Sequence, residues 1–178
     1  MNKLAERHPE KLLDLLTERL TFERTGVKLY DIVLSKMQGS QDKTISGMIP
    51  QLKKQRDQEK EHEEWLEEQV RALGSDAHTE TDLSELVLRE SRGVKEVVES
   101  DDELTHLFHA LLVAELVDEN GWKLLVQLAD EAEDQEALKS FIQRAREEED
   151  HLLYIRTVVA AYARREILDS PIPIPASI

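Results

Sequence analysis

The most informative absence in this sequence is cysteine, which occurs at none of the 178 positions. Disulfides, thiolate zinc sites, iron–sulfur clusters and rubredoxin-type electron-transfer modules are therefore excluded. Only six glycines and five prolines interrupt a chain rich in Glu, Leu, Lys and Arg, which are good helix formers. Valine and isoleucine form none of the alternating runs that are typical of strands. The composition therefore predicts an all-α protein.

Long apolar runs are also absent. No stretch approaches the ~18–20 apolar residues that a membrane span needs. The first residues, MNKLAERHPEK, contain no apolar signal region. We therefore expect a cytoplasmic protein with no membrane partner. The length fits one domain with a sizeable core.

Acidic residues outnumber basic ones, with 38 Asp and Glu against 23 Lys and Arg, for a formal net charge of -15. Nucleic acid would repel such a surface, so we expect no nucleic-acid partner. Most of the acidic residues are expected to lie on solvated helix faces. A weak attraction of cations is a second consequence of the same charge.

Apolar residues recur at three- and four-residue spacings in four long segments, as on the buried face of a helix. The predicted helices cover residues 9–38, 50–74 (with a start at Pro50 or one turn earlier), 100–129 and 134–168. Short connections make the first two helices, and the last two, antiparallel hairpins. Residues 75–100, with short helical pieces around DLSELVLRE and VKEVVE, then cross the bundle from end to end. We expect one domain over residues 1–168 and an extended, proline-rich tail over 169–178.

Each predicted helix carries one acidic residue near the middle of its apolar face: Glu23, Glu59, Glu115 and Glu148. Buried unpaired carboxylates cost several kcal/mol each, and four at one level would repel one another. Positive charge or protons must therefore compensate them. Two divalent cations balance four glutamates, and two neutral histidines complete the coordination.

Two of these glutamates belong to Glu-x-x-His motifs, which place both side chains on one helix face. His62 follows Glu59 by three residues, and His151 follows Glu148 by three. Both members of the second motif come 89 residues after those of the first. A third match, Glu103 with His106, lies off its helix's apolar face and is interpreted as coincidence. The repeat predicts two similar hairpins that form a pseudo-twofold metal site.

The four motifs together resemble the ferritin-like superfamily, especially bacterioferritins and rubrerythrins. The segments are LTFERTGVKLY, EKEHEEWL, AELVDENGWKLLVQLAD and REEEDHLLYI, within roughly residues 10–165. The resemblance implies a ferritin-like four-helix bundle with bridging Glu59 and Glu148, terminal Glu23 and Glu115, and one histidine on each metal. The chain departs from the family in lacking a cysteine-rich module and a short fifth helix, which argues against cage storage.

For several further residues, the sequence allows both a role in the metal site and a purely structural role. Asp118, one turn after Glu115, matches an acidic residue of rubrerythrins and is either a further metal ligand or a partly solvated neighbour. Tyr30 either orients a ligand carboxylate or only packs. Gln58 and Glu147 either hold the free ring nitrogens of His151 and His62 from across the bundle or face solvent. The remaining residues considered are expected to be surface histidines (His8, His78, His106, His109) or packing aromatics (Trp65, Trp122, Phe108, Phe141).

The resemblance implies an oxidoreductase of ferroxidase or peroxidase type, with two iron ions, dioxygen or peroxide as oxidant, and an unknown electron donor. Its catalytic residues would be the ligands Glu23, Glu59, Glu115 and Glu148. Imidazole and carboxylate ligands also suit manganese, and zinc could substitute. The alternatives are a dimanganese catalase-like enzyme and a non-catalytic metal-binding or structural bundle. A homodimer or higher homo-oligomer is expected.

Overall fold

The computed structural model describes residues 1–6, 8–171 and 173, and within them the chain is all-helical, with seven helices and no strand. The helices are α1 (Asn2–Ala5), α2 (Pro9–Met37), α3 (Lys43–Ala72), α4 (Asp82–Glu90), α5 (Arg92–Ser100), α6 (Leu104–Glu131) and α7 (Gln135–Leu168). None of the described helices is long and apolar enough to span a membrane.

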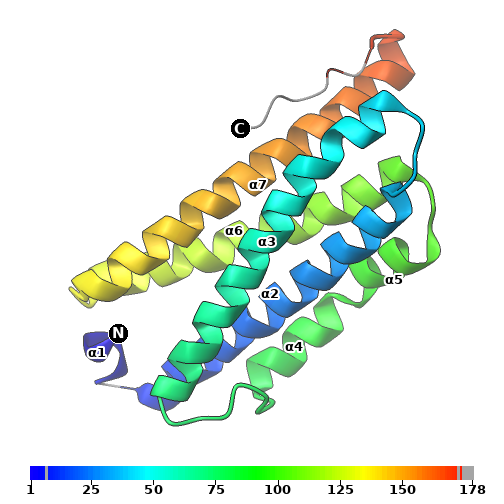
Figure 1. Ribbon diagram of the computed structural model, residues 1–178. Coiled ribbons are helices and arrows are strands. Elements are labelled where there is room, and N and C mark those ends of the chain that lie inside the picture. The colour runs from blue at the N-terminus through cyan, green and yellow to red at the C-terminus, as the bar shows by residue number, and fades with distance from the viewer. Residues whose placement is uncertain (7, 172, 174–178) are drawn as a thin grey trace.

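The four long helices lie side by side, with α2 and α7 running in one direction and α3 and α6 in the other (Figure 1). α2 packs mainly against α3, and α6 packs mainly against α7, so each hairpin is antiparallel. α4 packs along α2, and α5 packs against α6 and α2. The connection between the hairpins therefore crosses the molecule lengthwise and contains the two short helices that were predicted.

The predicted start of the second long helix was wrong. Asp42 accepts a hydrogen bond from the Thr44 backbone N–H at 2.7 Å, so the helix begins at Lys43 and continues through Pro50. An internal proline removes one helical hydrogen bond and usually kinks or ends a helix. Here Met48 and Leu52, on either side of it, are both fully buried, so packing holds the helix together.

The other helix ends are set by local caps. At Gly74, with φ of +86°, the Gly74 and Ser75 N–H groups return to the carbonyls of Arg71 and Val70, which is the predicted glycine stop. The predicted start of the third long helix at Ser100–Asp101 was early. The Asp101 side chain accepts from the Glu103 N–H at 2.8 Å in a turn, and α6 begins only at Leu104.

Helix α1 was not predicted, and Asp134 explains its place. One Asp134 oxygen caps α7 by accepting from the Ala137 N–H, as expected for the start of that helix. The other accepts from the N–H groups of Lys3 and Leu4, at 3.0 and 3.3 Å. The predicted extended tail falls largely on residues 172 and 174–178, which are outside the described residues.

The apolar core is divided into two clusters. One is centred on Leu16, Leu20, Trp122 and Phe141, and the other on Val33, Leu52, Phe108 and Ile155. Where the two clusters approach each other, every long helix carries a buried carboxylate: Glu23, Glu59, Glu115 and Glu148. This polar layer is where the sequence predicted a metal site.

Candidate metal centre

The six predicted ligands meet in the polar layer between the two clusters. Each of their residues is at most 2% exposed. Glu23 comes from α2, Glu59 and His62 from α3, Glu115 from α6, and Glu148 and His151 from α7. Their donor atoms form overlapping groups in which every atom lies within 4.8 Å of the others, and such groups could hold a metal ion.

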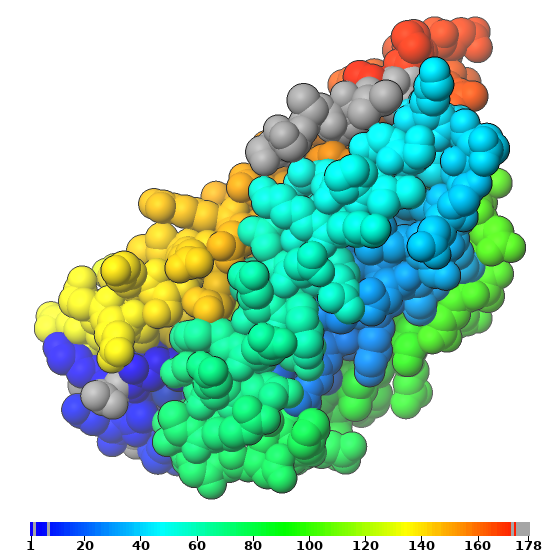
Figure 2. Space-filling view, in the orientation of Figure 1, coloured from blue at the N-terminus to red at the C-terminus, as the bar shows by residue number. Residues whose placement is uncertain are grey.

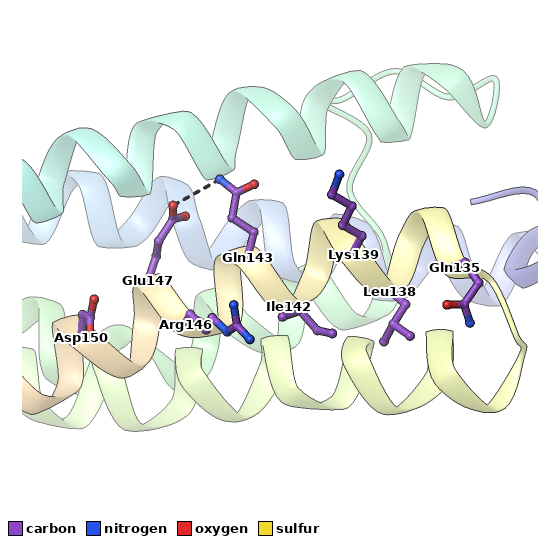
Figure 3. A pocket seen from close by; sticks show the side chains of 8 residues that line it. All are labelled: Gln135, Leu138, Lys139, Ile142, Gln143, Arg146, Glu147 and Asp150. Carbon is purple, nitrogen blue, oxygen red and sulfur yellow. Dashed lines mark hydrogen bonds between the residues drawn. The ribbon is translucent and has the colours of Figure 1, made fainter.

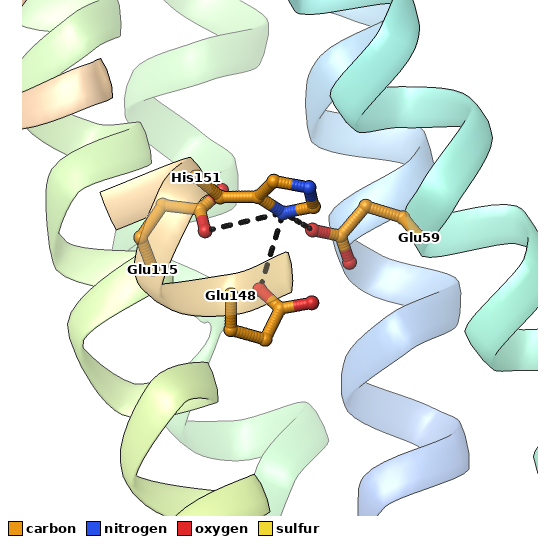
Figure 4. A group of neighbouring side chains, drawn as sticks. All are labelled: Glu59, Glu115, Glu148 and His151. Carbon is orange, nitrogen blue, oxygen red and sulfur yellow. Dashed lines mark hydrogen bonds and ion pairs between the residues drawn. The ribbon is translucent and has the colours of Figure 1, made fainter. Parts of the chain in front are cut away.

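The first group surrounds one ring nitrogen of His151 (Figure 4). His151 Nδ1 lies 3.1 Å from Glu59 Oε1 and 3.2 Å from Glu148 Oε2. Glu115 Oε2 is farther away, at 3.8 Å from the same nitrogen. Three carboxylates from three helices therefore converge on a single imidazole nitrogen.

The second group surrounds the corresponding nitrogen of His62. His62 Nδ1 lies 2.9 Å from Glu148 Oε1 and 3.5 Å from Glu23 Oε2. Glu148 is thus shared, with one oxygen facing each histidine, and the two rings are stacked with centroids 6.4 Å apart. This arrangement gives one histidine and at least one further glutamate to each of two neighbouring positions.

The other ring nitrogens fix the orientation of both histidines. His62 Nε2 lies 2.7 Å from Glu147 Oε2, and His151 Nε2 lies 3.1 Å from Gln58 Oε1. Because both partners offer oxygen acceptors, each Nε2 carries the proton in the neutral ring, and each Nδ1 keeps its lone pair for the interior. The predicted contacts across the bundle are therefore present, and Gln58 is half-buried rather than free in solvent.

Two aromatic donors orient the terminal glutamates. The Tyr30 hydroxyl donates to Glu115 Oε1, which is the more specific of its two predicted roles. Trp122 Nε1 donates to Glu23 Oε1 at 2.7 Å, so this residue does more than the packing expected of it. In each case the second oxygen of the carboxylate, Oε2, is left without a hydrogen bond and faces the site.

Asp118 joins the site together with its own counter-ion. Its carboxylate belongs to a third group with Glu23, Glu59 and Glu148. Arg19, which is 1% exposed, donates from Nη1 to Asp118 Oδ1 at 2.8 Å. The guanidinium lies against Gly121, where any Cβ would come within 2.2 Å of Cζ. Arg19 also donates to both Glu18 oxygens at 2.8 Å, so it offsets the negative charge of Asp118 only in part, and the four glutamates have no such partner.

No family model, curated protein or solved structure matches this chain. What the site can do follows from its donor atoms. It offers imidazole nitrogen and carboxylate oxygen without thiolate, and this set suits iron, manganese and zinc among the divalent metals.

The titration behaviour of these residues reflects the same lack of compensation. Burial, strengthened by the neighbouring carboxylates, raises the pKa of Glu59 and of Asp118 well above the usual range. Burial also raises the pKa of Glu115 to about 8, although His151 opposes the shift. For His62, burial alone would lower the pKa, but Glu147, Glu148 and Glu23 outweigh it and raise the pKa well above 6.5. Without metal, protons neutralise part of the site.

Burial alone would raise the pKa of Glu148 as well. His151 and His62, which face its two oxygens, instead hold the pKa of Glu148 below its usual range. This shared glutamate therefore stays ionised while its neighbours take up protons.

Three residues of the site were missed by the sequence interpretation: Arg19, Trp122 as a hydrogen-bond donor, and Gly26. Arg19 lies four residues before Glu23 and Gly26 lies three after it, so helical spacing from Glu23 could have indicated both. A Cβ at Gly26 would come within 2.7 Å of Glu59 Oε2, so this glycine makes room for a ligand carboxylate.

The six predicted ligands are buried, and side chains close the site from solvent. Figure 2 shows the side chains of α3 and α7 meeting along one face of the molecule. An open groove runs along the outer face of α7 from Gln135 to Asp150, and Glu147 lies in it beside Gln143 (Figure 3). Of the residues that line the groove, Glu147 alone contacts a site histidine.

The remaining predicted positions lie where they were expected. His8, His78, His106 and His109 are exposed, and His106 pairs with Asp101 at 2.7 Å rather than with Glu103. Phe108 and Phe141 are fully buried, and Trp65 packs on the core beneath Arg144.

Proposed function

We propose that this chain is a ferritin-like di-metal carboxylate protein, most readily a di-iron oxidoreductase of ferroxidase or peroxidase type. One observation supports the proposal above all others. Six buried atoms of the predicted ligands form no well-aligned hydrogen bond, although His62 Nδ1 and Glu148 Oε1 lie only 2.9 Å apart: Glu23 Oε2, Glu59 Oε2, Glu115 Oε2, both oxygens of Glu148, and His62 Nδ1. All five residues that carry them belong to groups in which one donor atom from each member lies within 4.8 Å of the others.

Buried polar atoms are normally paired, and each unpaired one costs roughly 1–3 kcal/mol or more. Six in one layer are hard to explain as packing. Cations at this layer would satisfy all of them at once, since lone pairs of carboxylate and neutral imidazole are metal ligands. The residues present therefore fit the metal pair that the sequence motifs imply.

The protein's own residues would act by holding and orienting donors. Glu23 and His62 would hold one ion and Glu115 and His151 the other, with Glu59 and Glu148 shared between the two. Tyr30 and Trp122 fix the two terminal carboxylates, while Glu147 and Gln58 fix the tautomers of the histidines. When bound, two iron(II) ions would supply electrons to dioxygen or hydrogen peroxide.

Anaerobic loading with iron(II), followed by oxygen or peroxide, tests this proposal. We expect a rapid rise in near-ultraviolet absorbance from the ferric product, with about two iron ions oxidised per chain. The Glu59→Ala and Glu148→Ala variants should lose the rapid phase. Glu61→Ala is the matched control, because Glu61 is an exposed glutamate on the same helix as Glu59.

Helical content measured by circular dichroism would establish that the variants fold. An equal absorbance rise in the wild type and in both ligand variants would refute the proposal. Elemental analysis of protein from iron-supplemented and manganese-supplemented cells would decide between di-iron and dimanganese centres. A catalase-like enzyme would release oxygen from peroxide only when it is loaded with manganese.

A structural bundle without metal remains the alternative from another class. It predicts unchanged stability after chelation and intact folding when the site glutamates become Gln. Self-association stays a prediction as well. Val113, Leu116, Val117 and Leu124, at 40–47% exposure on α6, support it, and sedimentation of the purified protein would test both dimer formation and a storage shell.

A further inference from the structure

The two site histidines have unlike partners on their outer ring nitrogens. His62 Nε2 faces the Glu147 carboxylate at 2.7 Å, whereas His151 Nε2 faces the Gln58 amide oxygen at 3.1 Å. Glu147 and Gln58 occupy equivalent places, since each directly precedes the glutamate of a Glu-x-x-His motif. The pseudo-twofold symmetry of the ligands therefore does not extend to the residues that contact the outer nitrogens of the two histidines.

The difference has a chemical consequence for the inner nitrogens. A hydrogen bond from N–H to an ionised acceptor is roughly twice as strong as one to a neutral acceptor. A carboxylate on Nε2 therefore draws its proton outward more strongly and makes Nδ1 a better electron-pair donor. The neutral amide of Gln58 fixes the tautomer of His151 but increases its donor strength less.

The other surroundings of the two positions do not cancel this difference. The Trp122 bond to Glu23 is matched by the Tyr30 bond to Glu115, so each terminal glutamate carries one neutral donor. Asp118 and Glu18 share the Arg19 guanidinium, at 2.8 Å each, and neither of them contacts a histidine ring nitrogen. The acceptor on Nε2 is thus the clearest chemical distinction between the two histidine ligands.

We propose that Glu147 is a positioning residue that makes His62 the stronger of the two histidine ligands, so that the two metal positions are chemically unequal. The inference rests on the proposed function, because it requires that two ions bind. Glu147 would act only through His62, and Gln58 only through His151. Exchanging the partners should therefore exchange the strengths.

Titration with manganese(II), followed by calorimetry and by the electron paramagnetic resonance signal of the free ion, tests the inference without any assay of activity. In Glu147→Gln we expect one of the two binding steps to weaken about tenfold or more, with the other unchanged. In Gln58→Glu we expect the other step to strengthen. A gain of affinity cannot come from damage to the fold, and both side chains are only partly buried, so the variants should fold.

Cobalt(II)-loaded protein would show which histidine changes. Each ligand ring N–H should give one exchangeable, hyperfine-shifted proton resonance, and Glu147→Gln should move only one of the two. Glu149→Gln, an exposed neighbour, is the matched control. Two ions bound with both steps within twofold of the wild type in Glu147→Gln, or weaker binding in Gln58→Glu, would overturn the inference. Failure of the wild type to bind any ion would instead overturn the proposed function.

Discussion

Replacing Glu115 by glutamine should stabilise the metal-free protein while impairing its metal site. Glu115 is buried, and its pKa rises from 4.5 to about 8 on folding. The folded protein therefore keeps a proton on Glu115 that the unfolded chain releases. Stability from this group is complete below pH 4.5 and is lost as the pH rises through about 8.

The size of the effect follows from the two pKa values. Each pKa unit corresponds to about 1.4 kcal/mol, so the raised pKa of Glu115 lowers the free energy of unfolding, relative to acid pH, by about 3 kcal/mol at pH 7 and about 5 kcal/mol at pH 9. Glutamine keeps an acceptor for the Tyr30 hydroxyl and never ionises. The variant should therefore escape this loss at alkaline pH.

Urea unfolding in the presence of a chelator, at pH 5, 7 and 9, measures the free energies of unfolding. The difference between Glu115→Gln and the wild type should grow in favour of the variant as the pH rises. Glu64→Gln, at an exposed position on α3, serves as the control and should show no such trend. A difference that is independent of pH, or that shrinks from pH 5 to 9, would refute the reasoning.

Three further predictions concern residues around the site. Gly26→Ala should displace the Glu59 carboxylate and so weaken manganese(II) binding about tenfold or more. Gly93→Ala should leave the affinity unchanged, because a Cβ there meets nothing within 4 Å. Equal affinities in the two variants would show that Gly26 does not make room for Glu59. Arg19→Leu should lower the free energy of unfolding by about 3–5 kcal/mol because it removes the buried partner of both Asp118 and Glu18, and adding Asp118→Asn should restore part of the loss. Urea unfolding of the single and double variants would show it, and additive losses would count against the pairing. Asp134→Ala should lower the free energy of unfolding by about 1 kcal/mol or more, because it removes the cap of α7 and the hydrogen bonds that hold α1. Thermal unfolding measures this, and an unchanged melting temperature would rule out that role for Asp134.

The sequence predicted the buried faces well because helical periodicity links each polar residue to its apolar neighbours. Glu23 and Glu148 could be placed in the core for this reason, and the spacing of the two motifs put both histidines beside them. Pro50 was misread because local propensity favours a helix start there, while the burial of Met48 and Leu52 overrides it. Burial of this kind depends on tertiary contacts, which a single sequence does not display.

The outer parts of the site show the same limit. Arg19 sits on a suitable helical spacing, but its partner Asp118 is 99 residues away, and nothing in the local pattern marks the pair. The positions of Gln58 and Glu147 suggested that they reach across the bundle, yet only the fold shows that both do. Whether these residues serve a metal pair stays a prediction.

The division of the apolar core has a consequence for how this chain can change. A layer of ionisable groups lies between the two apolar clusters. Side chains near Phe108 therefore cannot shift to fill a cavity that a substitution opens near Phe141. Losses of stability from substitutions in opposite clusters should add. Substitutions in one apolar cluster should therefore be tolerated independently of those in the other, whereas the polar layer between them constrains its residues through charge and hydrogen bonding.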